Sequence, residues 1–392
     1  MSWIKNVSRE IIKQKKLSNN YRIFKKLTNI ESPYSIYNDK KIINWSNNDY
    51  NSLTHNLDLK NHLNESIQKY GSGSSGTRNI GGSNKIHNYL ECKIAKLHNK
   101  EHGLLFNSGY LANLSSIQAL GRMFKNGMIL SDQLNHSSII NGIKLSQLPK
   151  KIFIHNDCEH LESLLKKNRQ KDKIIIVESL YSTNGNIAPL DDIIYLKKKY
   201  NALLYIDEIH AVGVHGKKLG GISDLSNNSH EIDIIMGGFG KGFGLVGGYI
   251  TGDTDLIDAI RLLGDGFIFT TSLPPHLVSG IIESIDISIK NSYKHQFQRK
   301  YNVNLFKNLA LQNEIPLVHN NFVDSQIQSV LIGCSQKAEK IHHILLNEHR
   351  HYVQHLNYPT VSKGNETLRI SLKCEHNEEM MNNLFEKLKY LF

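Results

Sequence analysis

Short apolar runs alternate with helical segments through the middle of the chain, and this alternation constrains the fold more than any other feature. The apolar runs include Met128–Ser131, Ile174–Val177 and Ala202–Ile206, and residues with helical periodicity separate them. Continuous apolar strands between helices are typical of a mostly parallel sheet that is covered on both faces. Ligands of such sheets bind outside the carboxyl ends of the strands. The sequence therefore predicts an α/β domain whose functional residues follow its strands.

Two of the predicted strands lead to residues with distinctive chemistry. Ala202–Ile206 ends at Asp207, with His210 three residues later, and Ile232–Met236 leads into a glycine-rich segment that contains Lys241. Pyridoxal phosphate (PLP) requires a carboxylate for its pyridine nitrogen and a lysine that forms a Schiff base. We therefore interpret the two strand ends as parts of a PLP site, in which His210 holds the ring hydroxyl.

Two glycine-rich segments match nucleotide-binding motifs at some positions but lack the other residues or the flanking strand that those motifs require. Gly242 follows Lys241, and Ile235 stands where a Walker-type loop has glycine. Gly71–Gly76 matches GxGxxG, but a helix precedes it instead of a strand, and no acidic residue ends a strand about 20 residues later. We expect Gly71–Gly76 to be either a flexible loop or a loop whose backbone approaches a substrate closely.

Composition narrows the class of protein further. The net charge is +11, but the lysines are dispersed and no nucleic-acid recognition motif is present, so no nucleic-acid partner is expected. The apolar runs are far shorter than the ~20 residues that cross a bilayer, so no membrane partner is expected. The four cysteines are far apart, which suits a reducing compartment. The clustered histidines lack zinc spacing, so no metal site is expected.

The pattern along the chain predicts three parts. Residues 1–47 form an N-terminal helix and an extended segment, residues 48–290 a large catalytic domain, and residues 291–392 a smaller C-terminal domain. The region 326–391 has a β-α-β-β-α pattern, with one short strand at Tyr352–Gln354. The smaller domain is therefore expected to be α+β.

Further candidate residues lie near the starts of helices and in the C-terminal domain. Ser108, Gly109 and Tyr110 open a helix after a strand, and free N–H groups at such a position can bind phosphate. His136 is placed to stack on an aromatic ring, or it is a buried structural histidine. Arg369 lies in a predicted strand, where its forked side chain suits a carboxylate ligand if it faces a cleft.

These residues occur in the order found in the α-oxoamine synthases, and the chain resembles that family of fold-type I PLP-dependent transferases from about Tyr21 to Leu391. The segments that carry the resemblance are Gly76–Ile80, Leu134–His136, Glu178–Ser182, Asp207–Gly213, Gly266–Pro275, Tyr352–Gln354 and Asn357–Val361.

The resemblance implies that Lys241, His136 and Asp207 are catalytic. Lys241 would hold the cofactor covalently and move a proton, Asp207 would contact the pyridine nitrogen, and His136 would stack on the ring. The remaining cofactor contacts would be to the ring oxygen and the phosphate, from Ser182, His210, Ser108, Gly109, Tyr110, Thr270 and Thr271. Because Thr270 and Thr271 would reach the phosphate in a neighbouring subunit, the resemblance implies a homodimer with shared sites.

Within the family the residues are closest to the acyltransferases that join glycine to succinyl-CoA, release CoA and CO₂, and form 5-aminolevulinate for heme and other tetrapyrroles. Arg369 and Asn48 would bind the glycine carboxylate. The succinyl carboxylate would contact Arg22, Thr77, Asn79 and Thr360. The implied location is the bacterial cytoplasm, or the mitochondrial matrix in a eukaryote.

Three departures from the family pattern leave the acyl-CoA preference open. Gly238 stands where a phosphate-binding Thr is expected, Asn51–Ser52 replaces the usual Leu-Gly, and Ser371–Cys374 replaces a proline-rich turn. The alternative is another α-oxoamine synthase with a different amino acid or acyl-CoA, including one that makes α-aminoketone or α-hydroxyketone signals. A PLP-fold subunit without catalysis would be expected to lack Lys241, which is present.

Overall fold

The computed structural model describes residues 2–18, 20–21, 23–318 and 324–392, which divide into two compact units. One, here called the sheet unit, comprises residues 48–182 and 186–297. The other, here called the terminal unit, comprises residues 1–47, 183–185 and 298–392. The structure thus groups the N-terminal segment with the C-terminal region, whereas the sequence pattern separated them.

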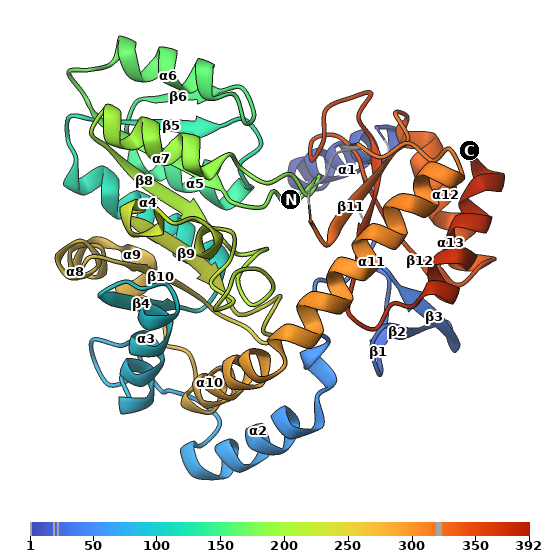
Figure 1. Ribbon diagram of the computed structural model, residues 1–392, viewed down its shortest axis with the longest axis horizontal. Helices are drawn as coiled ribbons and strands as arrows, with labels where there is room; N and C mark the ends of the chain where they lie inside the picture. The colour runs from blue at the N-terminus through green and yellow to red at the C-terminus, as the bar shows by residue number, and fades with distance from the viewer. Residues whose placement is uncertain (1, 19, 22, 319–323) are drawn as a thin grey trace. The chain divides into compact units, whose positions relative to one another are not determined.

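The sheet unit is built on a seven-stranded sheet in the order β4-β10-β9-β8-β7-β5-β6 (Figure 1). The strands β9, β8, β7, β5 and β6 run parallel, whereas β10 pairs antiparallel with both β9 and β4. The predicted mostly parallel sheet is therefore confirmed. The bounds are β4 His102–Phe106, β5 Gly127–Asp132, β6 Lys150–Phe153, β7 Asp172–Glu178, β8 Ala202–Asp207, β9 Ile234–Gly238 and β10 Gly248–Gly252.

Helices connect the strands of this sheet. Side-chain caps begin several of them, since a polar side chain can accept a hydrogen bond from the free amides of the first turn: Ser108 caps α4 and Asp157 caps α6. The helices are α2 Leu57–Tyr70, α3 Lys85–Leu97, α4 Gly109–Met123, α5 Ser137–Ser146, α6 Cys158–Lys167, α7 Leu190–Lys199, α8 Thr254–Leu263, α9 Asp265–Ile268 and α10 Pro275–Lys290. Helix α11, Ser292–Gln312, begins in the sheet unit and ends in the terminal unit.

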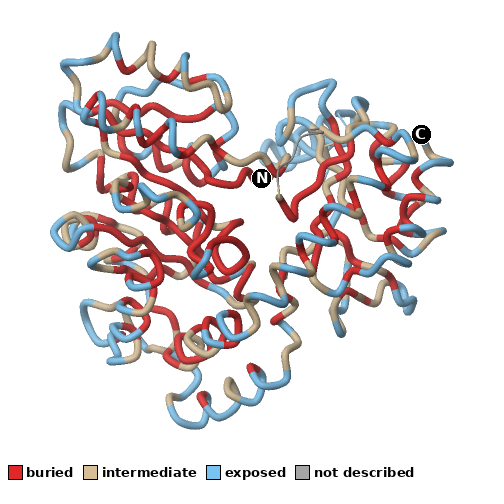
Figure 2. The backbone as a smooth tube through the Cα atoms, in the orientation of Figure 1, coloured by how far each residue is buried: buried red, intermediate tan, exposed pale blue. Residues whose placement is uncertain are grey.

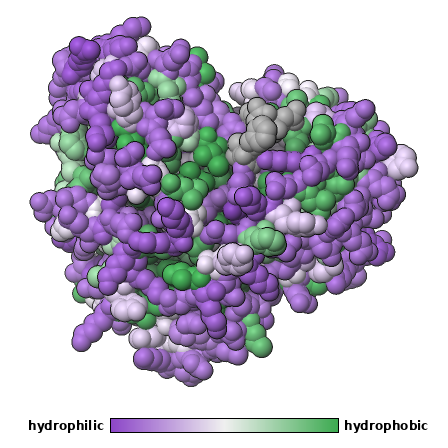
Figure 3. Space-filling view, viewed as in Figure 1, coloured by the Kyte–Doolittle hydropathy of each residue, from purple (hydrophilic) through white to green (hydrophobic). Residues whose placement is uncertain are grey.

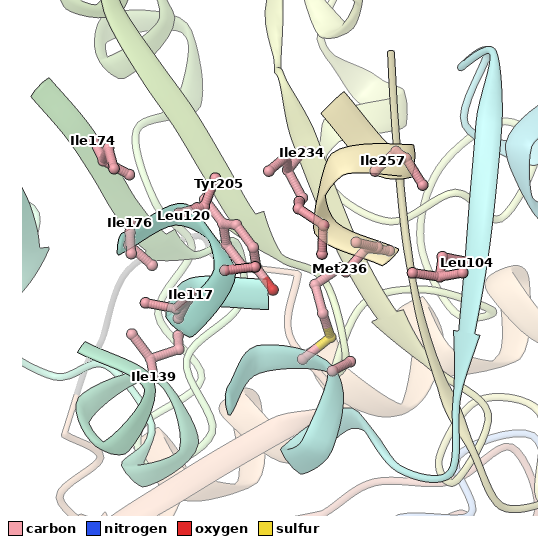
Figure 4. Packing of buried hydrophobic residues seen from close by; sticks show 14 of the residues in the cluster. Leu104, Ile117, Leu120, Ile139, Ile174, Ile176, Tyr205, Ile234, Met236 and Ile257 are labelled. Carbon is pink, nitrogen blue, oxygen red and sulfur yellow. The ribbon is translucent and has the colours of Figure 1, made fainter. Parts of the chain in front are cut away.

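Both faces of the central strands are buried, as Figure 2 shows by the red tube along them, whereas the edge strand β6 is exposed at three of its four residues. On one face, side chains of α4, α5 and α8 pack on alternate strand residues such as Ile174, Ile176 and Tyr205 (Figure 4). On the other face, α3 and α10 pack against Leu105 and Tyr249. Successive strand side chains point to opposite faces, so strands covered on both sides must be apolar at nearly every position. This explains the continuous apolar runs in the sequence.

The described residues of the terminal unit form two small sheets and three helices of its own. The sheets have the orders β1-β2-β3-β12 and β11-β14-β13. One core, which includes Trp45, Phe306 and Phe385, holds the unit together. The bounds are α1 Ser2–Leu17, β1 Thr28–Asn29, β2 Tyr34–Tyr37, β3 Lys40–Asn44, β11 Ile327–Leu331, α12 Ser335–Asn347, β12 His351–Tyr352, β13 Gln354–Leu356, β14 Thr367–Ser371 and α13 Glu378–Leu391.

The single strand predicted at Tyr352–Gln354 is wrong. The chain passes from β12, which pairs with β3, to β13, which pairs with β14, so it changes sheets at Val353. Val353 is fully buried in the core between the two pairings. The periodicity of three residues could not show that the partners differ on either side of this position.

The surface view in Figure 3 is mostly hydrophilic, with smaller hydrophobic patches. No helix in the described ranges is both long enough and apolar enough to span a bilayer.

Candidate active site

Three neighbouring strands of the sheet unit end at one cavity. Strand β8 ends at Asp207, β7 ends at Glu178 with its Cα in register with Asp207, and β9 ends at Gly238, three residues before Lys241. Parallel strands bring their carboxyl ends to the same edge of the sheet, as expected for a ligand site. The cavity is lined by Gly109, Tyr110, Asn113, His136, Ser138, Glu178, Asp207, Ile209, His210, Met236 and Lys241.

Asp207 is buried at the floor of this cavity, with 2% of its surface exposed. Its carboxylate accepts hydrogen bonds from Asn113 Nδ2 at 2.7 Å and from the Ile209 amide at 2.9 Å. Burial raises the pKa of Asp207, and the Asn113 bond, the Ile209 amide, Lys241 and His136 oppose the rise. A cationic partner in the cavity would favour the ionised form of Asp207.

Asn113 in α4 holds Asp207, although the sequence analysis did not single it out. Its Nδ2 also donates to Ser138 Oγ at 2.9 Å, and its Oδ1 accepts from Tyr205 OH at 2.9 Å. Both amide hydrogens and the amide oxygen are therefore engaged, which fixes the orientation of the side chain. An asparagine among the buried residues of a helix, where a polar side chain needs hydrogen-bond partners, was the signal in the sequence that could have indicated this role.

Lys241 begins a chain of side chains at the cavity wall. Its Nζ lies 2.6 Å from His210 Nε2, and His210 Nδ1 lies 2.8 Å from Tyr50 OH. Tyr50 OH in turn lies 3.2 Å from Asn48 Oδ1. A donating Nζ requires Nε2 to accept, so the protonated nitrogen of a neutral His210 is Nδ1. Tyr50 is a second residue of the site that the sequence analysis missed.

His136 stands at the start of α5, where its Nδ1 lies 2.8 Å from Ser138 Oγ and accepts a longer bond from the Ser138 amide. Ser138 connects it to Asn113 and so to Asp207. Burial and the Lys241 charge lower the pKa of His136, while Asp207 opposes this. The ring is therefore held neutral, in one orientation, along the cavity.

The amino end of α4 closes another side of the cavity. Ser108 caps the helix by accepting from the Leu111 amide at 3.1 Å. Gly109 has no room for a side chain, because a Cβ there would lie 2.3 Å from Ile209 Cδ1. The first turn of a helix carries amides that no helical carbonyl accepts from, which suits an anion. Tyr110 lines the same cavity, with its ring edge-on to His136.

Gly238 is tightly covered. A Cβ at this position would lie 2.8 Å and 2.9 Å from Cγ1 and Cδ1 of Ile209. The side chain of Ile209 thus fills the space that a residue larger than glycine would need. This explains how the chain accommodates its departure from the family pattern at position 238, where the cavity has an apolar side chain in place of a hydroxyl.

A second departure stabilises the segment around the lysine. Asn51 Nδ2 donates to the carbonyl oxygens of Gly213 at 2.6 Å and Gly242 at 2.8 Å. The side chain of leucine, expected here from the family pattern, could form neither bond. The next residue, Ser52, has a φ of 56°, a left-handed conformation that glycine adopts more easily.

The other predicted site residues lie in several places. Ser182 follows β7, and its amide donates to Glu178 Oε2 at 3.3 Å. Thr77 forms an isolated antiparallel bridge with Thr271, and Thr270 lines a small pocket together with Arg78 and Asn107. Neither Thr270 nor Thr271 lines the cavity of Asp207 and Lys241 within one chain.

The candidate substrate residues are divided between the units. Asn48, Thr77 and Asn79 belong to the sheet unit, and Arg369 and Thr360 belong to the terminal unit. Arg369 lies on β14 and donates to Ser371 Oγ at 2.9 Å. Arg22 lies outside the described residues. In the ranges that the structure covers, no group of three or more His, Cys, Asp or Glu side chains could hold a metal ion.

The chain is similar to known proteins over nearly its whole length. The family model for aminotransferases of class I and II matches residues 40–388. A 5-aminolevulinate synthase from Rickettsia prowazekii is 42% identical over 100% of this chain and 94% of its own length. The erythroid-specific mitochondrial 5-aminolevulinate synthase of Homo sapiens is 37% identical over 97% of this chain and 66% of its own. A solved structure of SPT with a PLP internal aldimine superposes with a TM-score of 0.91 at 25% identity, over 99% of this chain and 98% of the other.

Proposed function

Because the chain belongs to the 5-aminolevulinate synthase family of PLP-dependent acyltransferases, we propose that it condenses glycine with succinyl-CoA. The products are 5-aminolevulinate, CoA and CO₂, which places the protein at the start of heme and tetrapyrrole biosynthesis. The observation that carries the proposal is the cavity in which Asp207, His136, His210 and Lys241 converge at three strand ends.

The residues around this cavity fit PLP. Asp207 is a buried carboxylate with its orientation fixed by two donors, which suits a protonated ring nitrogen. Lys241 is a primary amine at the wall, and the start of α4 offers amides to a phosphate. The glycine at position 109 supports this fit, since any side chain there would collide with Ile209 and crowd those amides.

PLP, when bound, supplies an electron sink that stabilises negative charge on the carbon next to the substrate amine. The protein residues set the conditions for this chemistry. Asp207 would keep the ring nitrogen protonated, and Asn113 holds Asp207 in place at 2.7 Å. His136 would cover the ring and, as a neutral imidazole, would add no positive charge to it. Ser182 and His210 are proposed to contact the ring oxygen.

Lys241 is proposed to remove the proton from the glycine Cα and to return protons later in the reaction. His210 supports this role because its Nε2 lies 2.6 Å from Nζ and can accept a hydrogen from it. Tyr50 and Asn48 fix the opposite side of the imidazole. The amine is therefore held in one direction while it exchanges protons, which favours a proton transfer at a single carbon.

The substrate contacts are proposed from the family pattern. Arg369 and Asn48 would bind the glycine carboxylate, and Arg22, Thr77, Asn79 and Thr360 the succinyl carboxylate. Thr77 supports this assignment, because its Oγ1 is buried and has no hydrogen-bond partner among the described residues. A buried hydroxyl in that state gains free energy when a ligand accepts its hydrogen bond.

A homodimer with shared sites is also proposed. Thr270 and Thr271 do not line the Lys241 cavity of their own chain, which supports a role for them at the cofactor phosphate of a second copy. The molar mass in solution, measured by light scattering, tests this directly. Since the Rickettsia relatives are bacterial proteins, we also infer a cytoplasmic location.

The decisive experiment mixes pure protein, PLP, glycine and a series of acyl-CoA thioesters. We expect 5-aminolevulinate from succinyl-CoA and little turnover of acetyl- or palmitoyl-CoA. Consumption of another acyl-CoA, with no product from succinyl-CoA, would support the alternative that the chain is a synthase of a different α-aminoketone. The relatives argue against that alternative, because identity is 42% to a 5-aminolevulinate synthase and 25% to SPT.

A further inference from the structure

Glu178 is a second buried carboxyl group in the cavity, and the mechanism above does not use it. It is the last residue of β7, in register with Asp207 at the end of β8. Side chains of register partners on neighbouring parallel strands point to the same face of a sheet. Both residues line the cavity, and Glu178 is 1% exposed. Two carboxyl groups therefore stand side by side at one end of the site.

The two carboxyl groups have unequal hydrogen bonds. Asp207 accepts two bonds of 2.7 Å and 2.9 Å, whereas Glu178 Oε2 accepts one from the Ser182 amide at 3.3 Å. Glu178 Oε1 is buried and has no hydrogen-bond partner within the described part of the chain. A buried ionised oxygen without a donor is costly, but a protonated oxygen is itself a donor and needs only an acceptor.

The surrounding charges favour the proton on Glu178. Burial, and then the Asp207 carboxylate, raise the pKa of Glu178 well above its ordinary value. Lys241 and the amides of Ser182 and His136 oppose this rise in pKa. None of them forms a hydrogen bond of good geometry with Glu178 Oε1. Tyr181, which follows on the same segment, stays neutral because burial raises the pKa of its phenol. Two adjacent carboxylates cannot both ionise at neutral pH without a large cost.

On the basis of the proposed PLP site, we infer that Glu178 is a cofactor-binding residue that remains a neutral carboxylic acid and donates a hydrogen bond from Oε1 to an oxygen of the bound cofactor. Asp207 is then the one anion of the pair, and its full charge faces the ring nitrogen. The neutral partner lets the cavity hold two carboxyl groups with different tasks, one as an acceptor and the other as a donor.

The test uses apoprotein titrated with PLP in the absence of glycine and succinyl-CoA, so that it does not depend on the substrate. Glu178→Gln keeps a neutral group with donors, and we expect its Kd for PLP to stay within about threefold of wild type. The pH midpoint of its visible absorption band should be unchanged. Glu178→Ala removes the donor, and we expect about tenfold weaker PLP binding.

Asp207→Asn is the comparison, because it removes a residue that the inference holds to be ionised. We expect this variant to bind PLP more weakly and to lower the pH midpoint of the visible absorption band. The inference is overturned if Glu178→Gln lowers the midpoint in the same way, because Glu178 would then be ionised. It is also overturned if Glu178→Ala binds PLP as tightly as wild type. If Glu178→Ala does not fold, the pH midpoint of the absorption band in Glu178→Gln still shows whether Glu178 is neutral or ionised. A wild-type protein without PLP binding would remove the cofactor assignment itself, which is a separate outcome.

Discussion

The strand ends of the cofactor cavity and the glycine-rich loop Gly71–Gly82 differ in how firmly their residues are held. Asp207, Asn113 and His210 have hydrogen-bond partners at 2.6–2.9 Å, and Gly238 is in tight contact with Ile209. In the loop, a Cβ added at Gly71, Gly73 or Gly81 would have no atom within 4 Å, whereas one at Gly82 would lie 2.0 Å from the Gly76 carbonyl oxygen, so only part of the loop is open.

This difference suggests that the strand ends bind the cofactor and that the loop binds a substrate. A cofactor that is present in every turnover is best served by a rigid site, because orientation then costs nothing during the reaction. Substrates must enter and leave, and the open positions of the loop can adjust to them at little cost. We therefore expect mutations at the strand ends to affect PLP and chemistry, and mutations in the loop to affect acyl-CoA binding.

The largest expected effect comes from Lys241. Lys241→Ala should lower the rate of 5-aminolevulinate formation by about 10³-fold or more, because the group that moves the Cα proton is lost. Lys217→Ala, at an exposed lysine nearby, serves as the matched control and should retain activity. Circular dichroism establishes that both variants are folded. Near-normal activity in Lys241→Ala would contradict the assigned role.

Asn113→Ala tests the support of Asp207. The lost hydrogen bond to a charged group is worth about 1.5–3 kcal/mol, so PLP binding should weaken about 10- to 100-fold. Because this bond lowers the pKa of Asp207, its removal raises that pKa further. The fall in PLP affinity on acidification should therefore begin at a higher pH than in wild type.

The measurement for Asn113→Ala is PLP affinity across a pH series, with Asn126→Ala as a control at an exposed asparagine. An unchanged pH profile would show that the Asn113 bond does not control the ionisation of Asp207.

A pair of glycine variants compares the two regions directly. Gly238→Ala should lower the free energy of unfolding by about 1–3 kcal/mol, because its Cβ collides with Ile209. Gly81→Ala, in open space, should change it by less than about 0.5 kcal/mol. Denaturant unfolding followed by circular dichroism measures both. In Gly238→Ala combined with Ile209→Ala, the two losses should be less than additive. Equal effects of the two single variants would remove the contrast between the regions.

The smallest expected effect concerns Thr77. Thr77→Val preserves shape and removes the buried hydroxyl, so the KM for succinyl-CoA should rise about 3- to 10-fold, as for one neutral hydrogen bond. PLP affinity and the KM for glycine should stay unchanged, and these serve as internal controls. A change in PLP affinity instead would mean that Thr77 contributes to the cofactor site. It would contradict the expectation that loop residues affect only acyl-CoA binding.

Much of the sheet unit could be predicted from the sequence. Strands buried on both faces are apolar at nearly every position, so Ile174–Val177 and Ala202–Ile206 could be identified without any partner. The chemistry at the ends of these strands, Asp207 and Lys241, followed from the same pattern. The change of sheets at Val353 could not be predicted, since pairing partners are not encoded in a run of three residues.

The residues that support the chemistry were visible only in the tertiary structure. Asn113 lies 94 positions from Asp207, and Tyr50 lies 160 positions from His210, yet each pair is joined by one hydrogen bond. Neither residue belongs to a local motif, because its task is defined by a partner from a distant element.

The sequence by itself determined an α/β fold and a family, and it indicated Asp207 and Lys241 as the candidate pair for PLP. These properties depend on local periodicity and on residue type at strand ends, which are short-range features. The tertiary structure decided which polar side chains hold that pair, why position 238 remains glycine, and that Glu178 stands beside Asp207. Such relations depend on the register of neighbouring strands and on packing between helices, so they exist only after the chain has folded.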